Sequence, residues 1–334
     1  MRILRLAAAF GILLYGLAAS PAADPLPSWN DGPAKTAIVN FVHVTTDPSS
    51  PQFVPAEQRL ATFDQDGTLW VEHPIYTQFM FVLSQIAAMA PQHPAWKTTP
   101  PFKAVLDRDE AAMVKFTQKD LVTLLATTST GISMDAFHAS AKAWIAQARD
   151  RRWKRHYNEL IYQPMLEAMR YLRANGYKTY IVTGGGQEFV RAFSMETYGV
   201  PVDQVIGSTG ETKFVEKNGQ TELMKLPKLQ LNNDKSGKPE DIYLFIGRKP
   251  QAAFGNSTGD QQMLEYAQSS PGAHLEMLVL HDDATREYAY GPAAGLPNTK
   301  VGTFTQNLYD YAKANGWIVI SMKNDWKRIF SFDP

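Results

Sequence analysis

The feature that most constrains the fold is an apolar segment that ends in two acids. Residues 59–63 are typical of a buried β-strand, and Asp64 and Asp66 follow at its end. Gly67 and Thr68 then turn the chain. Alternate side chains of an extended segment leave on the same side, so both carboxylates can converge at the carboxyl end of the strand. The sequence therefore predicts a pair of acids at one edge of a sheet.

Two carboxylates at one point repel each other and need a cation or a shared proton. Mg²⁺ suits such a pair, because it takes few carboxylates and keeps coordination sites for phosphate and water. One acid could then attack phosphorus as a nucleophile while the other handles the proton of the leaving group. The alternative is a surface turn, since Asp-Gly is common in turns. The apolar lead-in to Asp64 favours the buried site.

The sequence DQDGTL at residues 64–69 resembles the first motif of the haloacid dehalogenase superfamily, and within it the phosphatases of the phosphoserine phosphatase type. The resemblance implies that Asp64 is the nucleophile and becomes an aspartyl-phosphate. It implies that Asp66 is the general acid and base, with its backbone carbonyl also facing Mg²⁺. The true dehalogenases of the superfamily lack the second acid, so Asp66 argues against cleavage of a carbon–halogen bond.

A second apolar strand, Lys178–Val182, ends in Thr183 and three glycines, and a helix follows at once. Backbone N–H groups of such a loop, with the helix N-terminus, form a cradle for an anion. Thr183 can add a hydroxyl, and Gly184 and Gly185 are expected to contact the phosphate. A dinucleotide fingerprint does not fit, because Phe189 occupies the position of its third glycine. The segment is similar to the second motif of the superfamily, although such a turn alone could be only a tight connection.

Lys238 stands directly before Pro239, which suits the first position of a helix over Pro239–Phe245. Lys238 would then be the N-cap residue, where Ser, Thr, Asp or Asn is usual and where the helix dipole disfavours a cation. A lysine is explained there if it faces the nucleophile and the transferring phosphoryl group. It matches the third motif of the superfamily, with Lys235 as the competing candidate and a solvated surface as the alternative for both.

The strand Ala252–Phe254 leads into Gly255 and a turn that is similar to the fourth motif, in which two acids complete the Mg²⁺ site. Here the first acid position holds Asn256, and only Asp260 is acidic. An amide oxygen can coordinate Mg²⁺ but brings no charge, and Asn256→Asp is expected to be tolerated. The predicted metal ligands are Asp64, Asp66, Asn256 and Asp260, and the predicted catalytic residues are Asp64, Asp66, Thr183 and Lys238.

Two other functions fit parts of the sequence. Ser257 lies in a G-x-S-x-G pattern, as in serine hydrolases, and His281 with Glu265 or Glu276 could complete a triad. That alternative leaves the motif at Asp64 unexplained and puts the nucleophile late in the chain. The second alternative is a periplasmic protein that binds an anion without turnover, in which Asp64 would have no evident role.

Secondary-structure patterns divide the chain into a core and an insert. Ile75–Ala90, Lys103–Ala126 and Met134–Arg151 have helical periodicity, and strands then alternate with helices to the end. Asn218-Gly219 predicts a hairpin. This order predicts an α/β fold with a Rossmann-like parallel sheet and a helical cap over its carboxyl edge. The expected parts are a signal peptide (1–23), an N-terminal extension (24–55), an α/β core (56–74 and 158–334) and a helical cap (75–157).

Composition narrows the partners and the compartment. The chain has 334 residues with 33 basic and 33 acidic side chains, so no global charge attracts nucleic acid or an anionic membrane. It has no cysteine, which excludes disulfides and thiolate catalysis. Arg2 and Arg5 precede an apolar run, Leu6–Ala19, which is typical of a signal peptide for periplasmic or secreted proteins. The alternative is an uncleaved anchor, although about 20 residues are needed to span a bilayer.

Taken together, the four motifs predict a Mg²⁺-dependent phosphomonoester phosphatase. It would act through an aspartyl-phosphate on a small organic phosphate, with Mg²⁺ as its cofactor and no nucleic acid or membrane partner after signal cleavage. The basic run Arg151–His156 is expected to be a solvated helix face or to draw the ester towards the cleft. The aromatic residues of the cap, such as Trp96 and Trp144, are expected to pack in the cap or to line the substrate site.

Overall fold

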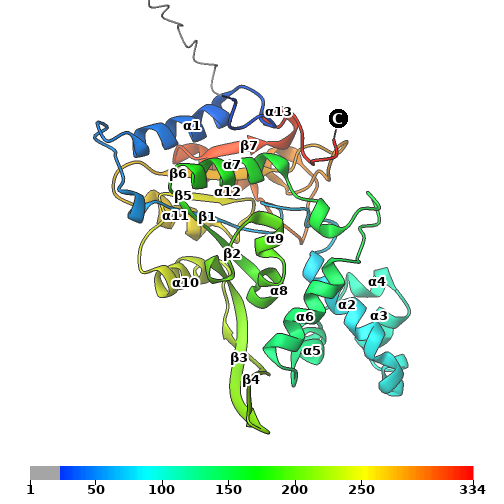
Figure 1. The fold of residues 1–334 in the computed structure, drawn as a ribbon. Helices are drawn as coiled ribbons and strands as arrows, with labels where there is room; N and C mark the ends of the chain where they lie inside the picture. The colour runs from blue at the N-terminus through cyan, green and yellow to red at the C-terminus, as the bar shows by residue number, and fades with distance from the viewer. Residues whose placement is uncertain (1–22, 334) are drawn as a thin grey trace, which may run out of the picture.

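The computed structural model describes residues 23–333, and in it seven strands form one sheet (Figure 1). Their order across the sheet is β4-β3-β2-β1-β5-β6-β7, and every neighbouring pair is parallel except β3 with β4. The strands are β1 Leu60–Phe63, β2 Lys178–Gly186, β3 Val205–Lys217, β4 Gln220–Leu231, β5 Ala252–Gly255, β6 Leu275–Leu280 and β7 Ile318–Ser321. The predicted α/β fold with a parallel sheet is confirmed.

Helices cover both faces of the sheet. One face packs against α1, α7 and α8 through residues such as Ile38, Met169 and Phe189, and the other against α10, α11 and α12. Phe254 and Ala253 of β5 enter opposite layers, because successive side chains of a strand point to opposite faces. The core helices are α1 Pro33–Thr46, α7 Gln163–Ala174, α8 Gln187–Arg191, α9 Ser194–Tyr198, α10 Gly237–Ile246, α11 Gln261–Gln268, α12 Gln306–Ala314 and α13 Met322–Asp325.

The N-terminal part of the described chain belongs to this packing. Ile38, Phe41 and Val42 of α1 are buried in the core cluster on one face of the sheet. Residues 24–55, expected from the sequence to be an extension, thus contribute a helix that covers the sheet. The predicted signal peptide, residues 1–23, lies outside the described residues except for its last position. Within residues 23–333, no helix is long and apolar enough to cross a membrane.

The helical insert follows β1, as expected, but its helices are shorter. They are α2 Thr77–Met89, α3 Phe102–Leu106, α4 Glu110–Met113, α5 Gln118–Ser129 and α6 Met134–Ile145. The single helix predicted over Lys103–Ala126 is wrong, because Asp109 and Thr117 cap new helices. The Asp109 side chain accepts a hydrogen bond from the Ala112 N–H, and Thr117 forms a capping box with Asp120. Short 3₁₀ helices lie at Ala56–Gln58, Ala90–Gln92, Pro94–Lys97, Tyr157–Glu159, Val202–Gln204 and Ala293–Gly295.

Two further segments differ from the predicted helices. The helix expected directly after the three glycines, over Gln187–Tyr198, breaks into α8 and α9, with Ala192 and Phe193 between them. The basic run Arg151–His156 is no helix face, because α6 ends at Ile145 and the run lies in a turn closed by a bridge between Arg149 and His156.

The hairpin of β3 and β4 projects from the sheet beside the insert (Figure 1). It turns at Asn218 and Gly219, whose φ values of 55° and 77° suit a tight hairpin turn, and this prediction is confirmed. Its second strand contacts the insert. The Gly131 N–H donates to the Lys225 carbonyl at 3.0 Å, and the Lys225 N–H donates to the Ile132 carbonyl at 2.9 Å. The insert is therefore attached to the core at the hairpin as well as at its own two ends.

Candidate active site

Three neighbouring strands carry the predicted site to one edge of the sheet. β1 lies between β2 and β5 and is parallel to both, with Phe63 opposite Ile181 and Phe254. Their carboxyl ends therefore meet at the same edge. Asp64 directly follows β1 there and Asn256 directly follows β5, while Thr183 lies within β2, two residues beyond Ile181. This is the edge at which parallel α/β sheets bind their ligands.

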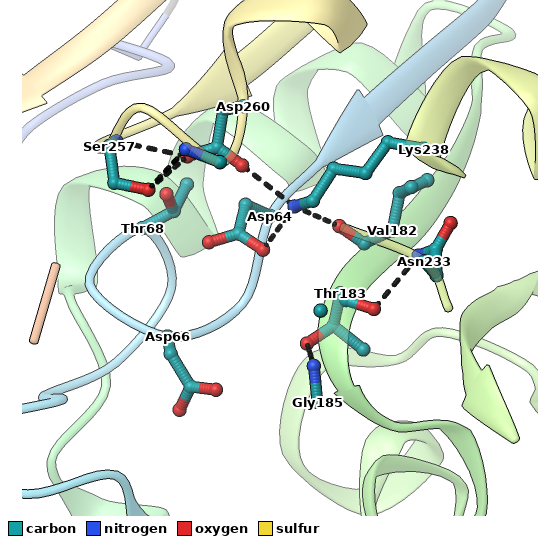
Figure 2. Close-up of polar contacts among 12 residues, drawn as sticks. Asp64, Asp66, Thr68, Val182, Thr183, Gly185, Asn233, Lys238, Ser257 and Asp260 are labelled. Atoms are coloured by element: carbon teal, nitrogen blue, oxygen red, sulfur yellow. Dashed lines mark hydrogen bonds and ion pairs between the residues drawn. The ribbon is translucent and has the colours of Figure 1, made fainter. Parts of the chain in front are cut away.

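A buried lysine joins two of the predicted acids. Lys238 Nζ lies 2.6 Å from Asp64 Oδ1 and 2.7 Å from Asp260 Oδ1, and it donates to the Val182 carbonyl at 2.8 Å (Figure 2). The Lys238 side chain is 2% exposed. Lys235, the competing candidate, is exposed. The structure therefore places Lys238, and not Lys235, against the first acid.

The start of α10 differs from the sequence prediction. The helix begins at Gly237 with Ser236 as its N-cap, so Lys238 is its second residue and Pro239 its third. A Cβ at Gly237 would lie 2.0 Å from the Asn232 carbonyl oxygen. Only glycine permits this close approach, and it lets the helix begin two residues earlier than Pro239 indicates.

The cluster carries more acid than base. Burial acts to lower the pKa of Lys238, but Asp260 and Asp64 outweigh it and the pKa is raised, so Lys238 stays charged. Burial raises the pKa of the Asp64 carboxyl, and the nearby Asp260 adds to this effect. One ammonium is shared by two carboxylates, and it does not offset the rise in the pKa of Asp64. A further cation at this edge would supply the missing charge.

Asp66 stands apart from the lysine network, and Figure 2 shows its carboxylate directed away from Lys238. Its Oδ1 accepts a hydrogen bond from Trp70 Nε1 at 2.7 Å. Burial raises the pKa of Asp66 to about 6, although Trp70 and Lys238 oppose the rise. Its Oδ2 lies near the glycines that follow Thr183, since a Cβ on Gly185 would come within 3.6 Å of it. The two acids, separated by one residue, therefore have different surroundings.

The strand predicted over Lys178–Val182 is longer in the structure, because the three glycines expected to form a loop are the last residues of β2. This segment, the glycine loop of the sequence prediction, is held from two sides. Thr183 Oγ1 accepts from the Gly185 N–H at 3.0 Å, and Asn233 Nδ2 donates to the Thr183 carbonyl at 2.8 Å (Figure 2). From the insert, Gln78 on α2 accepts a hydrogen bond through Oε1 from the Gly186 N–H at 2.7 Å. Gln78 thus brings the insert to the loop that the sequence assigns to the phosphate.

The turn after β5 is organised by Asp260. Its Oδ2 accepts from the N–H groups of Asn256 and Ser257, each at 3.0 Å. The Asn256 side chain reaches the motif at the end of β1, because Thr68 Oγ1 donates to its Oδ1 at 3.1 Å. Its Nδ2 donates to Glu72 Oε1 at 2.8 Å. Asn256 therefore contacts the turn that follows the first two acids.

Three side chains of this site were not predicted from the sequence. Glu72, Gln78 and Asn233 contact the predicted motifs, and Glu72 and Asn233 are buried. Glu72 carries a weak signal, since it is an acid at the end of the apolar run Leu69–Val71. Gln78 and Asn233 carry none, because their neighbours are typical of an ordinary helix and an ordinary loop.

A family comparison agrees with this geometry. Residues 61–265 match the family described as haloacid dehalogenase-like hydrolase, which is more than half of the chain. The chain belongs to the haloacid dehalogenase-like hydrolases. The matched region contains all four motifs, from the strand before Asp64 to the helix after Asp260. A comparison with curated proteins found no match.

Solved structures are similar to this haloacid dehalogenase-like hydrolase at low sequence identity. A protein of unknown function from Bordetella pertussis Tohama I is 16% identical, with a TM-score of 0.48, over 79% of this chain and 98% of that chain. A functionally unknown protein from Anaerococcus prevotii DSM 20548 is 16% identical, with a TM-score of 0.46, over 75% and 86%. A substrate-bound phosphoserine phosphatase is 15% identical, with a TM-score of 0.33, over 76% and 98%.

The residues of the predicted serine triad are engaged elsewhere in the structure. His281 Nε2 lies 2.8 Å from the Gly67 carbonyl, which can only accept, so this nitrogen carries the proton. His281 Nδ1 lies 3.1 Å from Glu287 Oε2. Ser257 Oγ lies 3.3 Å from Asp260 Oδ2. His281 therefore supports the turn after Asp64 and offers no base to Ser257.

Proposed function

We propose that this hydrolase is a phosphomonoester phosphatase that acts through an aspartyl-phosphate. The observation that carries the proposal is the different surroundings of its two aspartates. Asp64 is bound to Lys238 in the ion network, whereas Asp66 stands apart with a pKa raised to about 6. Two titratable groups in such different environments suit a nucleophile and a general acid–base.

Each step of the reaction has a residue of this chain in place. Asp64 attacks phosphorus in line, a bond forms between its carboxylate and phosphorus, and the bond to the leaving oxygen breaks. Asp66 gives its proton to that oxygen. Lys238 and Thr183 lie where they can offset charge on the phosphoryl oxygens. Asp66 then takes a proton from water, which attacks the aspartyl-phosphate, releases phosphate and restores Asp64.

The donor atoms at this edge fit a magnesium ion, on which the family typically depends. Asp64, the backbone carbonyl of Asp66 and Asn256 Oδ1 would hold it. Asp260, which the sequence also predicts as a ligand, has both oxygens engaged by Lys238 and the turn at Asn256, so we assign it to holding these groups instead. Within residues 23–333, no group of three His, Cys, Asp or Glu side chains is arranged to hold a metal ion, so the proposed site would depend on the amide and carbonyl oxygens as well. When bound, Mg²⁺ neutralises charge on the transferring phosphoryl group.

A small organic phosphate is the substrate class that we favour. The insert brings Gln78 to the Gly186 N–H, beside the loop proposed to hold the phosphate. A side chain in that place can contact the leaving group of an ester. The core residues of the site would contact only the phosphate group and the metal ion. The insert is therefore the part that would distinguish esters by their alcohol groups.

A panel of phosphate monoesters, assayed with Mg²⁺ and with EDTA, tests the proposed function. We expect hydrolysis with Mg²⁺, loss of hydrolysis in EDTA and recovery when Mg²⁺ is restored. Asp64→Asn is the control for contaminating phosphatases. Binding of phosphate without turnover of any ester would indicate an anion-binding protein instead, and full activity in EDTA would contradict the metal site.

We also propose that residues 1–23 are a signal peptide and that the mature protein is exported. The support is the sequence alone, with Arg2 and Arg5 before the apolar run Leu6–Ala19. Mass spectrometry of the protein recovered from the periplasm or the medium tests this. We expect an N-terminus within a few residues of Asp24, and an intact N-terminus in the recovered protein would contradict cleavage.

A further inference from the structure

Glu72 forms a buried pair with the unusual residue of the fourth motif. Asn256 Nδ2 donates to Glu72 Oε1 at 2.8 Å, and the Tyr290 hydroxyl donates to the same oxygen at 2.8 Å. All three side chains are buried, with Glu72 2% and Asn256 1% exposed. Glu72 lies on the segment after β1, and 184 residues separate it from Asn256. Folding thus places an acid beside the position where the sequence lacks one.

The pair fixes the orientation of the Asn256 amide. If the amide were reversed, its Oδ1 would face Glu72 Oε1, and two acceptors would meet at hydrogen-bond distance. With Nδ2 bound to Glu72, the oxygen is directed the other way and accepts from Thr68 Oγ1 at 3.1 Å. Thr68 belongs to the turn that carries Asp64 and Asp66. Glu72 therefore aims the Asn256 oxygen at the first motif.

Two glycines leave room for this pair. A Cβ at Gly67 would lie 2.1 Å from Asn256 Nδ2 and 2.3 Å from Glu72 Oε1. A Cβ at Gly302 would lie 1.7 Å from Glu72 Oε1. Both residues have positive φ values, +74° and +61°, which favour glycine in any case. Two segments far apart in the chain therefore both accommodate the Glu72 carboxylate.

We propose that Glu72 is a positioning residue, which holds the Asn256 amide so that its Oδ1 faces the Asp64–Asp66 turn as a metal ligand. The Glu72–Asn256 pair supplies one acid and one amide where the ordinary fourth motif has an acid at position 256. Groups behind a metal ligand orient it, and their loss typically costs about 10- to 100-fold in metal affinity. This inference rests on the proposed Mg²⁺-dependent function.

The pair changes what is expected of Asn256→Asp. From the sequence, an added charge at a ligand position is expected to be tolerated. In the structure it would set two acids 2.8 Å apart in a buried space, and one of them would have to hold a proton or move away. The double variant Glu72→Gln/Asn256→Asp restores one acid and one amide, with their roles exchanged.

Calorimetric titration of Mg²⁺ into wild type, the two single variants and the double variant tests the pair without using activity. We expect Asn256→Asp to weaken Mg²⁺ binding by about 10-fold or more and the double variant to recover most of that loss. Glu72→Gln still offers an acceptor to the Asn256 amide, and we expect it to lose less than about 10-fold. The values of kcat/KM should follow the same order.

Glu276→Gln is the matched control, because Glu276 is also buried but lies beside His274 near the start of β6. It should bind Mg²⁺ like wild type, and thermal melts identify any variant that fails to fold. If Asn256→Asp alone does not fold, a folded double variant that binds Mg²⁺ still supports the pair.

Two results would overturn the inference and leave the proposed function intact. One is an Asn256→Asp variant that binds Mg²⁺ as tightly as wild type does. The other is a double variant whose loss is the product of the two single losses. A wild-type protein that shows no Mg²⁺ binding would remove the metal from the proposed function and the inference with it.

Discussion

The carboxyl edge of the sheet and the helical insert use their charged residues in different ways. At the edge, Lys238 is 2% exposed and lies against Asp64 and Asp260. On the insert, Arg151 and Glu110 form an ion pair whose side chains are 72% and 71% exposed. The first group is buried among partners that fix each atom, and the second is surrounded by solvent.

This difference agrees with the proposed division of roles, in which the core performs the chemistry and the insert selects the substrate. Exposed ion pairs contribute about 0–1 kcal/mol, whereas removal of one partner from a buried pair costs about 3–5 kcal/mol. We attribute the buried charges at the sheet edge to the needs of the proposed reaction. The insert contacts the glycine loop through Gln78 and the hairpin of β3 and β4 through Gly131 and Ile132. Other parts of it pack within the insert, as Trp96 does against Phe102.

The largest effect is expected from Asp64→Asn at the sheet edge. The variant keeps the shape of the side chain but loses the nucleophile, so turnover of an aryl phosphate should fall by several orders of magnitude. The variant should stay folded, because the amide oxygen can still accept from Lys238 and Asp260 still pairs with this lysine. Steady-state kinetics and thermal melts measure both, and more than about a tenth of wild-type kcat would contradict the assignment.

A second large effect is expected from Lys238→Met, with Lys235→Met as its matched control. Loss of the ammonium leaves Asp64 and Asp260 buried without their cation, so the free energy of unfolding should fall by about 3–5 kcal/mol. Activity should fall by about 100- to 1000-fold, since charge on the phosphoryl oxygens loses a partner. Denaturant unfolding and kinetics are the measurements. Equal effects of the two substitutions would remove the distinction between the two lysines.

The pH profile should depend on the leaving group. Burial raises the pKa of Asp66 to about 6, so its proton is present below that pH and lost above it. For an alkyl phosphate, whose leaving oxygen needs a proton, kcat/KM should fall by about 10-fold per pH unit above this pKa. An aryl phosphate with an acidic leaving group should show a weaker fall. Parallel profiles for the two esters would argue against Asp66 as the general acid.

Gln78→Ala tests the boundary between the two regions. We expect it to change relative kcat/KM between esters by about 10-fold, because Gln78 reaches the glycine loop from the insert. Trp144→Ala is the comparison, since Trp144 packs against Phe81 and Tyr157 within the structure. It should lower stability and change all esters by one common factor. A common factor for Gln78→Ala as well would make the insert a lid without a role in selection.

The smallest effect is expected on the surface of the insert. Arg151→Ala breaks the exposed pair with Glu110, and the melting temperature should change by less than about 2 °C. Kinetic constants should stay at wild-type values. The run Arg151–His156 forms a turn, and the hydrogen bonds and ion pairs of the described residues do not join Arg151 to the acids at the sheet edge. A clear loss in kcat/KM would show that this basic run helps to attract the ester.

Much of the fold and site was predictable because its signals are local. Each motif at a strand end depends on a few adjacent residues, as at Asp64 and Thr183, and the turn at Asn218-Gly219 needs only its own backbone. The break before α5 was also readable, since Thr117 and Asp120 are a capping box four residues long. The prediction of one long helix gave apolar spacing more weight than that cap.

Sequence alone determined that two acids follow a buried strand, that a hydroxyl and three glycines lie at the end of another, and that a lysine lies in the first turn of a helix. These are properties of short segments, whose backbone fixes where their side chains point. Only the tertiary structure decided that Lys238 meets Asp64, that Gln78 reaches the glycine loop and that Glu72 holds Asn256. The physical reason is separation along the chain. The contacts of Lys238 with Asp64 and of Asn256 with Glu72 join residues 174 and 184 positions apart. They depend on the order of the strands in the sheet and on the close packing that glycine allows, and no local sequence pattern encodes either.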